Sequence, residues 1–275
     1  MKIIKVELPK EIKELILCPL ADLHIGAPEC DIDFIKNEIK YIQETPNAYC
    51  VLNGDIIDNS TRNSVGDVYS QTLSPQQQID LASELLMPIK DKIIAITNGN
   101  HEERSYRESG IDLMSYLAVK LGKEDYYANE SAFIFLTFGI NKTHTKGAMA
   151  NREKSYSPMQ FTVYITHGRG GGRKEGAKAI RLADMANIID ADCYIHSHTH
   201  LPMTMKENFF RVDYSRQSVI ETEKLFVNTG STLGYAKYAE KLECKPSSKA
   251  MPKIIFSKKY KHGASHPQKE MKVIM

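Results

Sequence analysis

The stretch IIAITNGNHEERS, residues 93–105, joins an apolar run directly to a polar cluster. The run Ile93–Ile96 is typical of a buried strand, because it has no polar face to turn toward water. The cluster that follows places His101 and two acids immediately after Asn98-Gly99-Asn100. Such a cluster at the end of a strand is either a turn or a site, and the rest of the chain decides between the two.

The first hundred residues alternate between strand and helix patterns. Apolar runs at Leu15–Leu20 and Tyr49–Leu52 resemble the run before the cluster. Between them, isoleucines at positions 32, 35, 39 and 42 share one face of a helix that ends near Pro46. A second helix begins at the capping box Ser74-Pro75-Gln76-Gln77 and continues to about residue 87. This βαβαβ order favours a parallel sheet covered by helices.

The remaining chain has more strand patterns than helix patterns. We expect helices at 110–121 and at about 177–189, and a second sheet built from Ala132–Phe138, Phe161–Ile165, Asp192–Ile195, Phe209–Tyr214 and Leu225–Val227. Residues 1–275 then form a single domain. It would carry a polar loop insertion at 141–160 and a basic C-terminal extension from about 241, with residues 257–270 loosely structured.

Composition and charge exclude several classes of protein. No stretch approaches the ~18 apolar residues needed to cross a membrane, so we expect a soluble, cytoplasmic protein with no membrane partner. The five cysteines lack CxxC spacing, which indicates free thiols rather than a disulfide framework. The net charge is only +2, yet residues 142–181 and 241–275 each carry +7, so positive charge is concentrated in two segments. No pattern specifies homo-oligomer formation.

Four other polar clusters follow strand-like runs in the same way. They are Asp22-Leu23-His24, Gly54-Asp55-Ile56-Ile57-Asp58, Thr166-His167-Gly168 and His196-Ser197-His198-Thr199-His200. The carboxyl ends of parallel strands share one edge of a sheet, where ligands bind, so we expect the five clusters to converge. Six of the nine histidines fall within them, and turn formation alone explains that concentration poorly.

The side chains in these clusters are suitable metal ligands. Asp, His and Asn supply oxygen and nitrogen donors without any thiolate, a set that suits Mn²⁺, Fe or Zn²⁺. In Asp22-x-His24 and His198-x-His200 we expect the alternation of an extended strand to aim both side chains the same way. Two cations about 3.5–4 Å apart can clamp the attacking and leaving oxygens of a phosphoryl displacement. The clusters contain enough ligands for such a pair.

Together the five clusters resemble the signature of the calcineurin-like metallophosphoesterases. The resemblance spans residues 22–200, and Val227-Asn228-Thr229-Gly230-Ser231 is similar to the segment that usually follows. It implies an α/β fold of four layers, in which two mixed β-sheets face each other and are flanked by helices, with a dinuclear metal site at the sheet edges. It also implies two divalent cations as cofactors, which we expect to be Mn²⁺, with Fe or Zn²⁺ as alternatives.

The resemblance further implies roles for individual residues. The metal ligands would be Asp22, His24, Asp55, Asn100, His167, His198 and His200. Of these, Asp55 would bridge the two cations; Asp22, His24 and His200 would hold one and the remaining three the other. His101 would be catalytic, stabilising the transition state or protonating the leaving oxygen, and Asp58 would orient its ring.

The last cluster departs from the family pattern, which usually reads Gly-His-x-His. Ser197 replaces that glycine, which affects the backbone of the loop but removes no ligand. The additional His196 leaves an alternative register open, in which His196 and His198 form the pair and His200 takes no part.

Basic residues near the clusters suggest a phosphate-rich substrate. The candidates for phosphate binding are Arg104, Arg107, Arg169, Arg173 and Lys174, because guanidinium groups hold phosphate oxygens bidentately. Together with the segment from Lys142 to Lys154 they would form an electrostatic track for a nucleic acid backbone. The alternative is a flexible basic loop, residues 169–174, without fixed contacts.

We therefore expect a phosphodiesterase or nuclease that acts on DNA, similar to the DNA-repair exonuclease branch of the family. The alternative is a small-molecule phosphatase or a cyclic-nucleotide phosphodiesterase. A protein serine/threonine phosphatase is disfavoured, because Asn59-Ser60 stands where that branch has Arg-Gly after the second aspartate. A non-catalytic scaffold is disfavoured, because neither a ligand nor the catalytic histidine is missing.

Overall fold

The computed structural model describes residues 1–64, 66–142, 156–170, 172, 174–215, 217–235, 245–246, 248–259 and 268–275. Its strands form two six-stranded sheets. The first sheet, in the order β1-β6-β7-β8-β10-β9, contains β1 (Lys2–Glu7), β6 (Ser131–Lys142), β7 (Tyr156–Thr166), β8 (Cys193–His196), β10 (Ser218–Asn228) and β9 (Met203–Asp213). The second, in the order β12-β11-β2-β3-β4-β5, contains β12 (Gln268–Ile274), β11 (Lys253–Lys259), β2 (Leu15–Leu20), β3 (Ala48–Asn53), β4 (Ile93–Thr97) and β5 (Tyr127–Ala128).

Both sheets are mixed. In the second sheet β2, β3, β4 and β5 run parallel, and β11 joins β2 in the antiparallel sense. In the first sheet the parallel neighbours β7, β8 and β10 lie between the antiparallel partners β6 and β9. The carboxyl ends of β2, β3, β4, β7 and β8, each of which precedes a polar cluster, therefore lie at corresponding edges of the two sheets.

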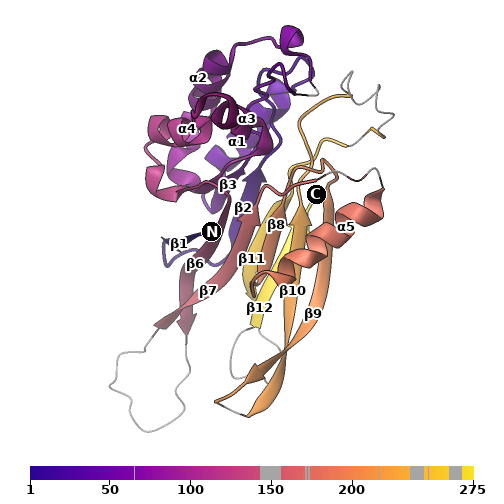
Figure 1. Ribbon diagram of the computed structural model, residues 1–275. Coiled ribbons are helices and arrows are strands. Elements are labelled where there is room, and N and C mark those ends of the chain that lie inside the picture. The colour runs from indigo at the N-terminus through magenta and orange to yellow at the C-terminus, as the bar shows by residue number, and fades with distance from the viewer. Residues whose placement is uncertain are drawn as a thin grey trace.

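Helices cover the outer face of each sheet. They are α1 (Ile32–Glu44), α2 (Pro75–Leu86), α3 (Asn100–Ser109), α4 (Leu113–Leu121) and α5 (Glu175–Asp184), and short 3₁₀ helices span Val68–Ser70, Met87–Lys92, Glu124–Tyr126 and Met185–Asn187. Figure 1 shows α1 to α4 grouped beside the second sheet and α5 against the first. The expected four-layer α/β fold, with two mixed sheets flanked by helices, is confirmed.

The layers follow from the apolar periodicity of the chain. Along β2, Leu15 and Leu17 point into the core between the sheets, whereas Cys18 and Leu20 point toward the helices, as the period of two in a strand requires. Helix α1 buries Ile35, Ile39 and Ile42 on one face. At the start of α2, the Ser74 side chain accepts from Gln77 N, and the Gln77 side chain accepts from Ser74 N, which confirms the predicted capping box.

One helix lies where the sequence pattern indicated only a polar cluster. Helix α3 begins at Asn100 with Gly99 as its N-cap and ends at Gly110, whose φ of 76° stops the helix. Among the residues of this helix, NHEERSYRES, only Glu102 is buried. The helix therefore has no apolar stripe from which its sequence could predict it. The helix predicted at 110–121 is shorter, because Asp112 caps α4, which begins at Leu113.

Two segments expected to be irregular contain strands. The insertion predicted at 141–160 begins and ends in β6 and β7, where Lys142 pairs with Tyr156, and residues 143–155 lie outside the described part of the chain. In the C-terminal extension, β11 and β12 form a hairpin that adds to β2 and buries Ile254, Phe256 and Met271. The sequence pattern did not indicate this hairpin, because its lysines make the alternation of apolar residues difficult to recognise. Residues 260–267 and 236–244 lie outside the described residues.

No helix in the described part of the chain is both long enough and apolar enough to span a bilayer.

Candidate metal centre

The five polar clusters meet where the strand ends of the two sheets approach each other. Within the second sheet, the backbone of Asp22 donates from N to Gly54 O at 3.1 Å, and His24 N donates to Asp55 O at 3.0 Å. Within the first sheet, Ser197 N donates to His167 O at 3.1 Å. A bond from His198 N to Asp22 Oδ2, 3.1 Å long, then joins the two sheets. The convergence predicted from strand order is thus present in the structure.

The backbone at the clusters is not extended. The residues with left-handed φ include Asp22 (51°), His24 (48°), Asp55 (50°), His198 (67°) and His200 (53°). The prediction that strand alternation aims the paired side chains is therefore wrong, because these residues lie beyond the strand ends. Asp and His adopt this region more readily than most residues, but it remains unfavourable for any side chain with a Cβ.

One group of donor atoms is formed by Asp22, His24 and His200, whose candidate ligand atoms all lie within 4.8 Å of one another. The two imidazoles approach each other with their Nε2 atoms 3.2 Å apart. His200 Nε2 lies 3.3 Å from Asp22 Oδ1. Asp22 and His24 are almost completely buried. The other carboxylate oxygen of Asp22, Oδ2, accepts from His198 N and from Thr229 Oγ1, which holds Oδ1 toward the imidazoles.

A second group is formed by Asp55, His167 and His198, again within 4.8 Å. His167 Nε2 lies 3.1 Å from Asp55 Oδ2 and 3.1 Å from Asn100 Oδ1. Asp55 is anchored in the same manner as Asp22, because its Oδ1 accepts from the backbone N of His101 at 2.9 Å. The first turn of α3 therefore fixes one oxygen of this carboxylate and leaves the other facing the imidazoles.

Several atoms in these groups fit a bound cation. Among the described residues, the buried atoms Asp22 Oδ1 and His24 Nδ1 have no hydrogen-bond partner, a state that costs about 1–3 kcal/mol per group. Burial and the neighbouring His167 lower the pKa of His198 to about 4, so its imidazole is neutral and can act as a ligand. Burial opposes protonation of His167, but Asp55 raises its pKa to about 10. A cation held by the same atoms would replace that proton.

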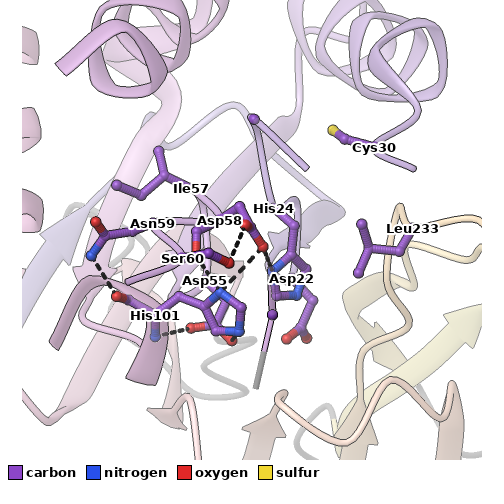
Figure 2. Close-up of polar contacts among 12 residues, drawn as sticks. Asp22, His24, Cys30, Asp55, Ile57, Asp58, Asn59, Ser60, His101 and Leu233 are labelled. Atoms are coloured by element: carbon purple, nitrogen blue, oxygen red, sulfur yellow. Dashed lines mark hydrogen bonds and ion pairs between the residues drawn. The ribbon is translucent and has the colours of Figure 1, made fainter. Parts of the chain in front are cut away.

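His101 lies between Asp55 and Asp58 (Figure 2), and its ring forms a third group of candidate ligand atoms with His24 and Asp58. Its Nδ1 is 2.6 Å from Asp58 O and 3.5 Å from Asp58 Oδ1, whereas its Nε2 is 3.8 Å from Asp55 Oδ2. Asp58 is itself held by Ser60 Oγ at 2.7 Å. Burial lowers the pKa of His101, but Asp55 and Asp58 outweigh burial and raise it above the ordinary value. The ring is therefore fixed through Nδ1 and presents Nε2 to the site.

Glu102 supports the site without any candidate ligand atom of its own. Its buried carboxylate accepts from the backbone N of Gly99, Asp55 and Ile57, at 3.0–3.1 Å. A Cβ at Gly99 would collide with the Asp55 backbone and with this carboxylate, so glycine is required there. Sequence reasoning assigned Glu102 no role, although an acid three residues after a helix cap is a recognisable signal.

Asn53 joins the strand ends of both sheets. Its Nδ2 donates to Thr166 O at 2.9 Å and to Ser197 Oγ at 2.7 Å, and its Oδ1 accepts from Thr97 Oγ1 at 2.7 Å. Its own carbonyl oxygen lies 2.8 Å from His167 Nδ1. Ser197, which replaces the usual glycine of the family pattern, is thus a hydrogen-bond partner of Asn53. Sequence reasoning missed this connection.

Replacing Asn53 with alanine is expected to destabilise the protein by about 2–4 kcal/mol, because three buried hydrogen bonds of about 0.5–1.5 kcal/mol each are removed. Urea unfolding with a fluorescent or circular-dichroism readout measures this change. Ser197→Gly removes one of the three bonds and is expected to cost only about 1 kcal/mol. Equal effects of the two substitutions would contradict the central position of Asn53.

Two further hydrogen bonds bear on the loop that carries His198 and His200. Lys178 of α5 donates from Nζ to Thr199 O at 2.8 Å. His196 points away from the two donor groups, since its Nδ1 is 2.8 Å from Asn228 Oδ1. The described geometry therefore brings His198 and His200, and not His196, to the candidate ligands. Sequence reasoning counted Lys178 only in the net charge of residues 142–181.

Of the expected phosphate-binding residues, Arg104 and Arg169 lie beside residues of the site. Arg104 donates from Nη1 to Asp58 O at 3.1 Å, beside the His101 ring. Arg107 pairs with Glu103 at 2.9 Å, and Arg169 pairs with Glu130 at 3.2 Å; both arginine side chains are about two-thirds exposed. Lys174 is exposed at the N-cap of α5. Arg173 lies outside the described residues.

Lys142, the first residue of the basic segment, is distant from the site. Lys142 pairs with the first residue of β7, whereas His167 follows the last. At about 3.3 Å per residue, β7 separates the two positions by roughly 35 Å. The single track expected from Lys142 to Lys174 would have to run the full length of this strand.

Comparison with protein families matches residues 20–202 to the calcineurin-like phosphoesterases. Comparison with curated proteins gives no match. Among solved structures, similar chains include a predicted phosphoesterase from Streptococcus pneumoniae, with 12% identity, a TM-score of 0.34 and coverage of 95% of this chain and 99% of that chain. Another is Vps29 complexed with zinc from Entamoeba histolytica, with 11% identity, a TM-score of 0.37 and coverage of 94% and 99%.

Proposed function

The chain belongs to the calcineurin-like phosphoesterase family and is a metal-dependent hydrolase of phosphoester bonds, and we propose that it is a phosphodiesterase that cleaves DNA. In this proposal Asp22, His24 and His200 would hold one divalent cation, and Asn100, His167 and His198 would hold another. Asp55 would contribute to both. The oxygen and nitrogen donors favour Mn²⁺, with Fe or Zn²⁺ as alternatives.

Two such cations supply Lewis-acid polarisation of a phosphoryl oxygen and lower the pKa of water. The protein's own contribution centres on His101. With Nδ1 held at Asp58 O, the doubly protonated ring, which the raised pKa of His101 favours, presents an Nε2–H to the site that can protonate the leaving oxygen. Arg104, which also donates to Asp58 O, reinforces the position of this carbonyl.

The observation that carries the DNA proposal is the set of basic side chains around the site. Arg104 and Arg107 lie on α3, Arg169 follows His167 by two residues, and Lys174 lies at the start of α5. Although Arg107 and Arg169 have carboxylate partners, exposed ion pairs contribute only about 0–1 kcal/mol. A DNA phosphate can therefore replace either partner at little cost.

The direct test is incubation of the protein with Mn²⁺ and end-labelled single- and double-stranded DNA, with product lengths followed over time. The His101→Asn variant, loaded with metal, is the control for contaminating nucleases. Digestion by the wild type alone supports the proposal, and the product ladder shows whether cleavage starts from ends. Absence of digestion by the metal-loaded wild type would contradict it.

The basic loop should also determine how binding depends on salt. Replacing Arg169, Arg173 and Lys174 together with glutamine is expected to weaken DNA binding. The slope of log K against log salt should fall by up to about 0.9 for each DNA phosphate that the variant no longer neutralises. Fluorescence anisotropy at several salt concentrations measures both quantities. A triple glutamine variant of the exposed residues Lys5, Lys40 and Lys90 carries the same charge change outside the site. Equal slopes for the two variants would contradict a role for the loop.

Hydrolysis of small phosphodiesters, including cyclic nucleotides, is the second candidate function. It is favoured by the small polar cavity beside Asn100 and His167. A single substituent of a small phosphodiester would extend into it. Cyclic nucleotides in place of DNA in the same assay distinguish this function from the first.

A further inference from the structure

The His101 ring is held by a backbone carbonyl as well as by a carboxylate. Its Nδ1 lies 2.6 Å from Asp58 O, and Arg104 Nη1 donates to the same oxygen at 3.1 Å. This oxygen belongs to the peptide group that joins Asp58 to Asn59. A trans peptide group is planar and directs its C=O and its N–H in opposite directions. Any group that fixes the Asn59 N–H therefore also fixes the carbonyl that the ring contacts.

The Asn59 N–H is fixed by Gln78, a residue of α2 that lies outside all five polar clusters. Asn59 N donates to Gln78 Oε1 at 2.8 Å. Although polar, Gln78 is completely buried. Its Nε2 donates to Gln71 Oε1 at 2.7 Å and to Leu73 O at 2.8 Å. Because both Nε2 hydrogens have acceptors, the amide has one favourable orientation, and Oε1 is directed at Asn59.

The surroundings of Gln78 restrict its side chain further. Gly26 has a φ of 105°, and a Cβ at that position would collide with the Gln78 side chain. Gln71, the acceptor for Gln78, bonds to both backbone groups of Ser60, accepting from N at 3.0 Å and donating to O at 2.8 Å. Ser60 in turn holds the Asp58 carboxylate. Gln78 thus anchors the whole turn that follows Asp58.

The side chain of Asn59 connects the same turn to α3. Its Nδ2 donates to His101 O at 2.7 Å (Figure 2), and its Oδ1 accepts from Ser105 Oγ at 3.1 Å. His101 and Ser105 are four residues apart and therefore lie on one face of the helix. Asn59 is buried and has a φ of 40°, a conformation that asparagine adopts more readily than most residues. The turn therefore holds His101 by its backbone as well as by its ring.

We infer that Gln78 is a positioning residue for His101, acting through the Asp58–Asn59 peptide group. The direction in which the ring presents Nε2 to the donor atoms then depends on a buried glutamine of α2. A general acid must lie within hydrogen-bond reach of the oxygen that it protonates, and a misplacement of about 1 Å can lower a rate about 10²-fold. The inference rests on the proposed catalytic role of His101 and adds a residue on which that role depends.

The test is a double-mutant cycle of Gln78→Met and His101→Asn, measured with Mn²⁺ on thymidine 5′-(phenyl phosphate) and thymidine 5′-(p-nitrophenyl phosphate). Methionine is as long as glutamine but cannot accept from Asn59 N. Phenolate is a stronger base than p-nitrophenolate and needs the proton more. Gln78→Met is expected to lower kcat about 10- to 100-fold on the phenyl ester and clearly less on the p-nitrophenyl ester. In the His101→Asn background, the same substitution should change kcat by no more than about twofold.

Gln76→Met is the matched control, because Gln76 is an exposed glutamine of the same helix, and it should keep both wild-type kcat values. A second variant, Gln78→Glu, retains an oxygen that can accept from Asn59 N but loses the Nε2 donor. It is expected to melt below the wild type and yet to keep the wild-type ratio of the two kcat values. Loss of stability and loss of positioning are thereby separated.

A loss in Gln78→Met that is equal on the two esters, or that persists in the His101→Asn background, would refute the inference and leave the role of His101 intact. If His101→Asn itself loses no activity, the role of His101 fails and the inference fails with it. If the wild type hydrolyses neither diester, the phosphodiesterase proposal fails. The same cycle on phenyl phosphate and p-nitrophenyl phosphate then decides the inference.

Discussion

The His101→Asn variant is expected to retain both metals and to lose about 10²- to 10⁴-fold in turnover of DNA, the range that one positioned general acid contributes. In the wild type, the Nδ1 atom of His101 is held by Asp58 O at 2.6 Å, and the Nε2 atom faces the donor groups. Asparagine preserves a polar side chain of similar reach but cannot deliver a proton. Kinetics of DNA cleavage and metal analysis by mass spectrometry measure the two quantities.

Two substrates with different leaving groups distinguish a loss of proton transfer in His101→Asn from a general disruption of the site. A nucleoside alkoxide needs a proton as it departs, whereas p-nitrophenolate is a weak base and needs much less help. The loss in His101→Asn should therefore be clearly smaller for thymidine 5′-(p-nitrophenyl phosphate) than for DNA. Loss of metal from the variant, or equal losses on the two substrates, would contradict the assigned role.

The second large effect is thermal stabilisation by metal. Because a cation at these donor groups binds the folded chain only, two sites at one hundred times their Kd add about 5 kcal/mol to the free energy of unfolding. For a chain of this size, that corresponds to a rise in Tm on the order of 10 °C. Differential scanning fluorimetry of metal-stripped protein, with and without Mn²⁺, measures the shift.

Asp55→Asn is expected to lose more than half of this rise in Tm, because the proposed bridge contributes to both cations. The substitution keeps the size of the side chain, and its Oδ1 can still accept from His101 N. Asp192→Asn, remote from the donor groups, serves as the control and should keep the full shift. A rise in Tm that is equal in Asp55→Asn and in the wild type would refute the bridging assignment.

Much of the fold could be predicted because local patterns and tertiary burial agree. The apolar runs of β2, β3 and β4 and the apolar face of α1 are buried where periodicity indicated. Strand β1 escaped prediction because its parallel partner β6 is more than one hundred residues away, with Lys2 opposite Ala132. Helix α3 escaped because Glu102 and Gly110 define it through caps, and almost none of it is buried.

The candidate ligands could be proposed from the order of their motifs, whereas the hydrogen bonds that support them could not. Asn53 forms a hydrogen bond with Ser197, 144 residues away. Lys178 of α5 forms one with the carbonyl oxygen of Thr199, in the loop after β8. Such pairs have no fixed spacing in the sequence. The direction of five of the seven candidate ligands also depends on a left-handed backbone, which a strand pattern does not predict.

Stability and function place opposite demands on five backbone positions of this enzyme. The left-handed residues are Asp22, His24, Asp55, His198 and His200. Each such residue costs roughly 1–2 kcal/mol relative to an ordinary conformation, and glycine at the same position would avoid that cost. Evolution under selection for heat resistance alone, in a medium without metal, should therefore accumulate glycine at His198 and His200, whereas the side chains of Asp22 and Asp55 also accept backbone hydrogen bonds that glycine would lose. The variants that melt latest in such a selection would be those that no longer hydrolyse anything.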